Sequence, residues 1–276
     1  MNGKKQHKNR KYLIGTALVL TLGATGLFIY QQNNAWSKQP AQLEYLPATG
    51  QAANTAASAE SKTGQVDFSE ETVGAMPVSF AAAVGNWTIG IDKGNKVLVV
   101  DGRKWSRGQA STGIADKARA LYGERYAEFL DNVQAYAYYP FAVNQHVDTF
   151  TNGQIKMRFK AIAGRIDQGA GILFDLKSNG DYYTVRANPL ENNLVLWRFK
   201  HGKRSSIDWV RNVPTPSREW HDLELIVHGK QITASVNGKQ YMAYILPAAV
   251  SGKVGVWTKA DSVVYFDDYT VIADKK

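Results

Sequence analysis

Short strand-like segments follow one another through the second half of this sequence and leave little room between them for helices. From Phe150 onward, apolar and polar residues alternate in segments such as 155–159 and 223–227, the pattern of strands with one wet face. Asn179-Gly180 and Asn237-Gly238 are typical of tight hairpin turns. At least nine such strands, with almost no helix between them, predict an all-β antiparallel sandwich rather than a parallel α/β sheet.

A hairpin and a helical segment precede these strands. Trp87, Ile89 and Ile91 alternate along one strand, and the apolar run 97–100 predicts its partner. Apolar residues then recur at helical spacing, which predicts a short helical insertion at about 114–134. Gly123 allows either one interrupted helix or two short ones. We expect one β-sandwich domain over residues 72–276.

The first 71 residues predict an anchor and a tether. Residues 1–11 form a basic n-region, and the uncharged run 12–30, at 19 residues, is long enough to span a bilayer as a helix. The basic flank places the N-terminus in the cytoplasm and exports the rest of the chain to the periplasm or cell exterior. No clean cleavage site follows Tyr30, which favours an uncleaved signal anchor over a signal peptide. Residues 31–71 contain few large apolar side chains and predict a disordered tether.

The net charge of +9 is concentrated at the N-terminus. Five basic residues and no acid lie in residues 1–36, and subtracting them leaves +4 for the rest of the chain. That mild excess argues against a nucleic-acid partner. The chain has no cysteine, so disulfides, a lipoprotein anchor and thiolate chemistry are excluded.

The stretch 181–206 carries an unusual set of polar residues on two predicted strands. Tyr182, Thr184, Arg186 and Asn188 share one strand face, and Glu191 and Asn193 follow in the turn. An aromatic ring stacks on the apolar face of a sugar, while guanidinium, carboxylate and amide groups bond its hydroxyls. These residues are therefore candidates for carbohydrate binding. The alternative is a solvated strand face beside a structured turn.

Several ordered segments resemble one protein family. They are Phe159-Lys160, Ala170-Gly171-Ile172, the run Y-Y-T-V-R-A-N-P-L-E-N-N-L that begins at Tyr182, Gly202-Lys203-Arg204, Trp220-His221, Val236-Asn237-Gly238-Lys239 and residues 252–268. Over roughly residues 149–273 the chain resembles the bacterial domains named after 3-keto-disaccharide hydrolase. The resemblance implies a concanavalin A-like, or laminin-G-like, jelly roll related to glycoside hydrolase family 16. It also implies a carbohydrate or glycoside ligand and, for some members, a hydrolase or lyase that acts on oxidised disaccharides.

The candidate catalytic residues are His221 and Glu191. Family 16 enzymes use an E-x-D-x-E motif, which is absent here, so the two-carboxylate mechanism is not expected. A 3-keto group acidifies the neighbouring C–H, and His221 could then act as the base. A histidine that caps the core beside Trp220 is the alternative for this residue.

The candidate ligand-binding residues lie on the central strands and near the end of the chain. They are Tyr182, Arg186, Asn188, Asn193, Arg204, Trp257, Lys259 and Asp261. A membrane-tethered carbohydrate-binding domain needs only this set, an enzyme also needs an acid or a base among them, and an envelope scaffold needs neither. We expect no cofactor. A structural calcium at Asp267-Asp268 is disfavoured because adjacent strand residues point to opposite faces.

Overall fold

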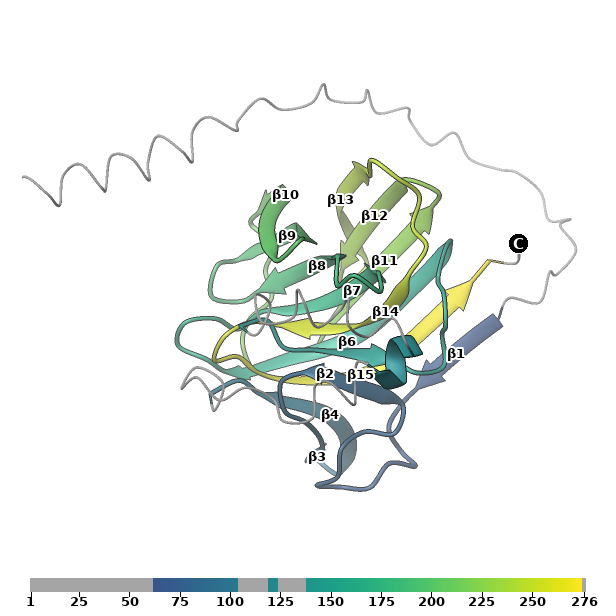
Figure 1. The fold of residues 1–276 in the computed structure, drawn as a ribbon. Coiled ribbons are helices and arrows are strands. Elements are labelled where there is room, and N and C mark those ends of the chain that lie inside the picture. The colour runs from purple at the N-terminus through teal and green to yellow at the C-terminus, as the bar shows by residue number, and fades with distance from the viewer. Residues whose placement is uncertain (1–61, 104–118, 124–137, 275–276) are drawn as a thin grey trace, which may run out of the picture. The chain divides into compact units, whose positions relative to one another are not determined.

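The computed structural model describes residues 62–103, 119–123 and 138–274 (Figure 1). Contacts divide the chain into two units, Met1–Ala57 and Ser58–Lys276, and every described residue belongs to the second. The predicted anchor at 12–30 lies outside the described residues. Among those residues, no helix is long and apolar enough to cross a membrane.

Within these residues, fifteen strands form two antiparallel sheets (Figure 1). The strands are β1 Lys62–Val66, β2 Phe80–Val84, β3 Trp87–Asp92, β4 Asn95–Asp101, β5 Phe141–Asn144, β6 Gly153–Ala163, β7 Ala170–Leu176, β8 Tyr182–Asn188, β9 Asn193–Lys200, β10 Lys203–Arg211, β11 His221–His228, β12 Gln231–Val236, β13 Lys239–Ile245, β14 Lys253–Thr258 and β15 Val263–Ala273. Of the predicted helical insertion, the structure describes residues 119–123, of which 119–122 are helical.

The strand order confirms a two-sheet sandwich with crossovers. The eight-stranded sheet runs β13-β12-β11-β6-β15-β4-β3, with β1 added to β15, and the seven-stranded sheet runs β10-β9-β8-β7-β14-β5-β2. Neighbours such as β6 and β15, or β7 and β14, are distant in sequence. The chain connections between such strands cross from one sheet to the other, which is typical of a jelly roll.

The main core lies between the two sheets. Ile155, Met157 and Phe159 of β6 are buried in it, whereas Lys156 and Arg158 between them point away, as the alternating pattern predicts. Val185 and Ala187 of β8 meet this core from the seven-stranded sheet. Burial of apolar surface at about 25 cal/mol per Å² makes this layer the principal source of stability.

The opposite face of the seven-stranded sheet, which we call the outer face, is also apolar over much of its area. A second cluster there contains Leu173, Tyr182, Phe199 and Trp257, and Tyr139 packs against it. Every residue of β7 is consequently buried, which explains its nearly unbroken apolar run.

The folded domain begins earlier than the predicted start at Thr72. Lys62–Val66 form β1, which pairs with Tyr269 to Ala273 of β15, and in Figure 1 this strand lies beside the yellow C-terminal strand. Val66 and Phe68 are buried in the main core. Two apolar side chains in a polar segment are a weak sequence signal, but they suffice when a strand edge is available for pairing.

Asp267 and Asp268 interrupt the pairing of β15 with β6. Asp267 is buried, accepts a hydrogen bond of 2.6 Å from Asn95 Nδ2, and accepts another of 2.9 Å from the Asp268 amide. Among the described residues, no cluster of three or more metal-ligating side chains includes this pair. Burial raises the pKa of the Asp267 carboxyl, and these two hydrogen bonds offset the increase only in part.

Replacing Asp267 by Asn should stabilise the domain at neutral pH. A folded-state pKa above the unfolded value means that folding holds the proton more tightly, so the ionised carboxyl lowers stability above that pKa. The melting temperature of Asp267→Asn should exceed that of the unmodified protein at pH 7, and the difference should shrink as pH falls through the raised pKa. Asp148→Asn, at an exposed position, should leave the melting temperature unchanged both at pH 7 and at lower pH. A lower melting temperature for Asp267→Asn at pH 7 would contradict this.

Candidate functional site

The predicted ligand-binding strand, β8, presents its polar residues on the outer face. Val185 and Ala187 point into the main core, so Thr184 and Arg186, which alternate with them along the strand, point the other way. Thr184 pairs with Trp197 of β9, and Asn188 pairs with Asn193 across the turn. Because directly paired residues share a face, Trp197 and Asn193 join the same surface.

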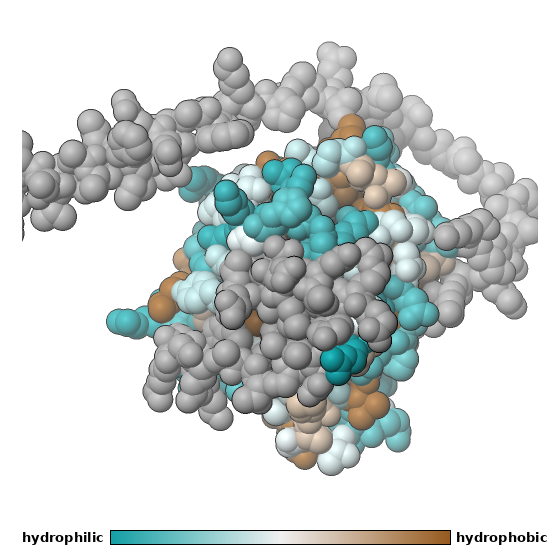
Figure 2. Space-filling model, in the orientation of Figure 1, coloured by the Kyte–Doolittle hydropathy of each residue, from teal (hydrophilic) through white to brown (hydrophobic). Residues whose placement is uncertain are grey.

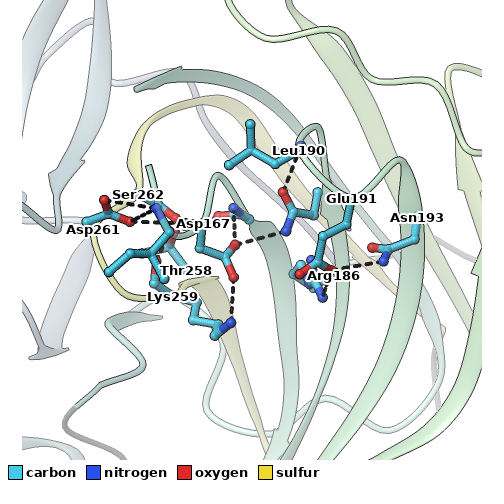
Figure 3. A network of polar contacts seen from close by, with 12 residues as sticks. Asp167, Arg186, Leu190, Glu191, Asn193, Thr258, Lys259, Asp261 and Ser262 are labelled. Carbon is cyan, nitrogen blue, oxygen red and sulfur yellow. Dashed lines mark hydrogen bonds and ion pairs between the residues drawn. The ribbon is translucent and has the colours of Figure 1, made fainter. Parts of the chain in front are cut away.

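Arg186, Glu191 and Asn193 form one hydrogen-bonded group at the β8–β9 turn (Figure 3). Arg186 Nη1 and Nη2 each donate to Glu191 Oε2 at 3.1 Å, and Asn193 Nδ2 donates to the same oxygen at 2.9 Å. The Arg186 residue is only 1% exposed, whereas the Glu191 side chain is 38% exposed. The ion pair therefore has one buried member on the sheet and one partly exposed member in the β8–β9 turn.

Glu191 is held in its ionised form by these contacts. Burial by itself would raise the pKa of Glu191, but the charge of Arg186 and the hydrogen bonds from Asn193 and Arg186 outweigh it. The net effect lowers the pKa below its usual range. A carboxylate with a lowered pKa is a poor proton donor and a weak base, so Glu191 is better suited to accepting hydrogen bonds than to acid–base catalysis.

Asp167 connects three loops at the same end of the sheet. Its carboxylate is fully buried and accepts from Lys259 Nζ at 2.7 Å, the Gly169 amide at 2.8 Å and Asn188 Nδ2 at 3.1 Å. A Cβ on Gly169 would approach Arg186 Cδ and Asp167 Oδ1, both at 2.9 Å, so only glycine fits here. Asp167 thereby fixes the segment before β7, the β8–β9 turn and the residue after β14.

Asp261 supports Asp167 from the next turn. Its carboxylate accepts from the amides of Arg165, Ile166 and Asp167 at 2.8 to 3.1 Å. Burial would raise the pKa of Asp261, but these backbone hydrogen bonds lower it overall. In Figure 3, Asp167 lies between Asp261 and the Arg186–Glu191 pair. Lys259 and Asp261 are thus joined to Asn188 through Asp167, a residue not predicted from the sequence. The carbonyl of Asn188 accepts from the Glu191 amide at 3.3 Å, which connects this group to the Arg186–Glu191 pair.

An aromatic and cationic group occupies the β9–β10 side of the outer face. The Arg204 guanidinium lies 4.2 Å from the ring centre of Trp197 and 5.0 Å from that of Tyr139. Trp209 meets Trp197 edge to face, with ring centres 5.6 Å apart, and is 42% exposed. Trp209 is therefore a large aromatic ring that this surface presents to solvent. The sequence analysis selected Arg204 but not Trp209.

Two predicted ligand contacts are instead part of the outer-face cluster. Tyr182 stacks on Phe199 at 4.3 Å, and its hydroxyl accepts a hydrogen bond of 3.1 Å from Trp257 Nε1. Both Tyr182 and Trp257 are buried, so neither ring is open to a ligand. Alternation along each strand predicts the face on which these two rings lie. Their burial, however, depends on residues distant in sequence, such as Tyr139, that pack over them.

His221 lies on β11, in the other sheet, and contacts none of these residues through its ring. The ring is buried against Phe159, with Nε2 2.9 Å from the Pro216 carbonyl and Nδ1 3.1 Å from Asn237 Nδ2. Both ring nitrogens are occupied by local partners. The structure therefore does not bring His221 together with Glu191, and its contacts are those of a histidine that caps the core.

Four buried polar atoms on the outer face have no hydrogen-bond partner within the described part of the chain. They are Thr184 Oγ1, Arg186 Nε, Asn193 Oδ1 and Trp197 Nε1. Buried polar atoms normally have partners, because leaving one unpaired costs about 1–3 kcal/mol. All four atoms are buried beneath the outer face, so they belong to its packed layer and are not open to a ligand.

Two surface pockets lie elsewhere on the domain. One, of about 660 Å³, is lined by residues that include Tyr122, Lys177 and Lys253. The other, of about 510 Å³, lies beside β1 and β15 and includes His146 and Asp148. None of the predicted site residues lines either pocket.

Several solved structures are similar to this chain. No protein-family model and no curated protein matches the chain. The carbohydrate-binding module CBM66 from Bacillus subtilis aligns with a TM-score of 0.50 and 10% identity, over 70% of this chain and 95% of that one. The Crh5 transglycosylase aligns with a TM-score of 0.46 and 12% identity over 77% and 85% of the two chains. The galectin LEC-6 from Caenorhabditis elegans aligns with 0.36 and 18% over 48% and 95%.

The likeness to CBM66 concerns the fold alone, because only 10% of the aligned residues are identical. The chain is an antiparallel two-sheet sandwich of the jelly-roll type, as predicted from the sequence, and its membership of the concanavalin A-like superfamily stays a prediction. The narrower resemblance to 3-keto-disaccharide hydrolase domains stays a prediction.

Glu191→Ala should destabilise the domain. The substitution leaves the buried Arg186 guanidinium without its counter-charge, so the free energy of unfolding should fall by about 2 kcal/mol. Glu191→Gln keeps an oxygen acceptor, so its free energy of unfolding should lie between those of Glu191→Ala and the unmodified protein. Urea unfolding measures the three proteins, with Glu219→Ala at an exposed position as the control. Equal stability of Glu191→Ala and Glu219→Ala would refute a supporting role for the pair.

Proposed function

We propose that this domain binds carbohydrate on the outer face of its seven-stranded sheet, at the rim formed by Glu191, Arg204 and Trp209. The observation that carries the proposal is the position of Trp209. This exposed tryptophan packs against Trp197. The guanidinium of Arg186 lies 5.9 Å from the ring centre of Trp197. An exposed ring is therefore held next to the Arg186–Glu191–Asn193 group.

The geometry suits the two sides of a sugar ring. The C–H face of a pyranose packs on an aromatic ring such as Trp209, and its hydroxyls need donors and acceptors beside that ring. All three hydrogen bonds to Glu191 end on Oε2, which leaves Oε1 to accept from a hydroxyl. Asn193 is itself buried and contributes by donating to Glu191 Oε2, which helps to hold the carboxylate in place.

The fold adds support at a coarser level. CBM66, whose structure shares the sandwich with this chain, is named as a carbohydrate-binding module. A shared fold does not transfer a ligand, because unrelated functions occur on the same architecture. The proposal therefore rests on the residues of the site, and the fold shared with CBM66 is consistent with it.

The alternative from the family resemblance is hydrolysis or elimination on 3-keto-disaccharides. That reaction needs a proton acceptor and a proton donor at one sugar. Within the described residues, both nitrogens of His221 bind local partners on the other sheet, and the pKa of Glu191 is lowered. No specific observation favours the enzyme over the binding domain. An envelope scaffold without a ligand would have no affinity for any glycan, so a measurement of glycan binding distinguishes a scaffold from a carbohydrate-binding domain.

Trp209→Ala should weaken glycan binding while leaving the fold intact. A screen of the full-length protein against a glycan panel identifies a ligand, and titration of that ligand then gives the Kd. Loss of the stacking ring should raise the Kd about tenfold or more, equivalent to 1.4 kcal/mol. The melting temperature should change little, because Trp209 is partly exposed.

Trp220→Ala is the matched control for this experiment. Trp220 is a partly exposed tryptophan outside the outer face, where its Nε1 donates to Asp92 at 2.9 Å. Its loss should leave the Kd unchanged. Equal weakening by both substitutions, or the absence of any bound glycan, would contradict the proposal.

We also propose that residues 12–30 anchor this domain in the membrane and hold it outside the cytoplasm. The support is the apolar run with its basic flank. Full-length protein should remain with membranes after carbonate extraction, and a shortened protein that begins at Ser58, ahead of β1, should be released. A mature chain whose N-terminus falls between residues 30 and 40 would show that the run is cleaved instead.

A further inference from the structure

Arg204 differs in its partners from Arg186 and Lys259, the buried and half-buried cations near the same face. Arg186 is paired with Glu191, and Lys259 is paired with Asp167 at 2.7 Å. Within the described part of the chain, no carboxylate lies within ion-pair distance of Arg204, and its recorded contacts are the rings of Trp197 and Tyr139. Arg204 is half-buried, so part of its charge is removed from water without a counter-charge.

The strand that carries Arg204 gives this surface a positive bias. From the pairing of β10 with β9, the residues on the outer face are Arg204, Ser206, Trp209 and Arg211, opposite Phe199, Trp197, Val195 and Asn193. Two of the four are arginines and none is acidic. Figure 2 shows hydrophilic surface over the region where Figure 1 places β9 and β10.

The packing of Arg204 preserves its capacity to bind an anion. A guanidinium group beside aromatic rings keeps its charge, while the rings restrict its orientation. Its N–H groups radiate in the plane of the guanidinium and match the paired oxygens of a carboxylate or a sulfate. An anion held in this way would lie beside Trp209, because both Arg204 and Trp209 contact Trp197.

We propose that the ligand of this site is an acidic glycan, in which a carboxylate or sulfate group on the sugar binds Arg204 while the ring packs against Trp209. This inference rests on the proposed carbohydrate-binding function and adds the chemical class of the sugar. Glu191 then accepts hydrogen bonds from hydroxyls farther along the same surface. The acidic group need not meet the Glu191 carboxylate, because Arg204 pairs with Phe199 near one end of β9 and Asn193 starts the other end.

Binding of full-length protein to four polymers tests the proposal. Polygalacturonate carries carboxylates, dextran sulfate carries sulfates, dextran is neutral, and polyglutamate is an anion without sugar. At least one acidic polysaccharide should bind tenfold or more tightly than dextran and polyglutamate, and its affinity should fall as NaCl concentration rises. Whichever of the two acidic polymers binds more tightly identifies the anionic group.

Arg204→Gln and Lys203→Gln form a matched pair of variants. Both remove one positive charge from β10, but Lys203 precedes Arg204 and so points to the opposite face. Arg204→Gln should lose tenfold or more in affinity for the acidic polymer, and Lys203→Gln should lose less than twofold. Arg204→Lys, which keeps the charge without the planar fork, should fall in between and covers the case in which Arg204→Gln fails to fold.

The outcomes separate this inference from the proposed function. Equal losses in Arg204→Gln and Lys203→Gln, or equal affinity for polyglutamate and the acidic polysaccharide, would overturn the acidic-glycan inference. Equal or tighter binding to dextran would also overturn it while leaving carbohydrate binding in place. Binding to none of the three polysaccharides, and to no glycan in the wider panel, would overturn both.

Discussion

The buried carboxylate of Asp167 is the interaction on which the polar half of the outer face depends. A charge without solvent contact is tolerated only when it is paired and hydrogen-bonded, and Lys259, Asn188 and the Gly169 amide meet that requirement. Because these partners come from three loops, their positions are determined together. Asn188 opens the turn that carries Glu191, so the Arg186–Glu191 pair is positioned by the same carboxylate.

The aromatic half of the outer face has a different role. Tyr182, Phe199 and Trp257 cover the sheet where many sandwiches meet solvent, and they leave the exposed functional groups at its β9–β10 side. Trp197 is the link between the two halves, since Arg186, Arg204 and Trp209 all contact its ring. Groups that are held by buried neighbours lose little conformational freedom on binding, which favours affinity.

Sequence reasoning predicted the parts of this architecture that depend on local periodicity. Alternation along β8 places Arg186 on the face opposite Val185, and Asn-Gly pairs mark the hairpins. Pairing across 92 residues, as between Lys259 and Asp167, leaves no local pattern. Strict alternation from Arg204 would place Trp209 on the other face of β10, but the register shift between Ser206 and Asp208 returns it to the same face, so alternation alone does not predict its position. The burial of Arg186 and Tyr182 likewise depends on neighbours that come from elsewhere in the sequence.

The central claim is that carbohydrate binds on the outer face of the seven-stranded sheet. Hydrogen–deuterium exchange of the full-length protein, with and without a saturating glycan, tests it most directly because amide protection reports the location of a ligand. The account predicts slower exchange in peptides that cover the β8–β9 turn and β10, residues 188–211, and unchanged exchange in β11, β12 and β13. Protection confined to β11, β12 and β13, in the eight-stranded sheet, would contradict the account.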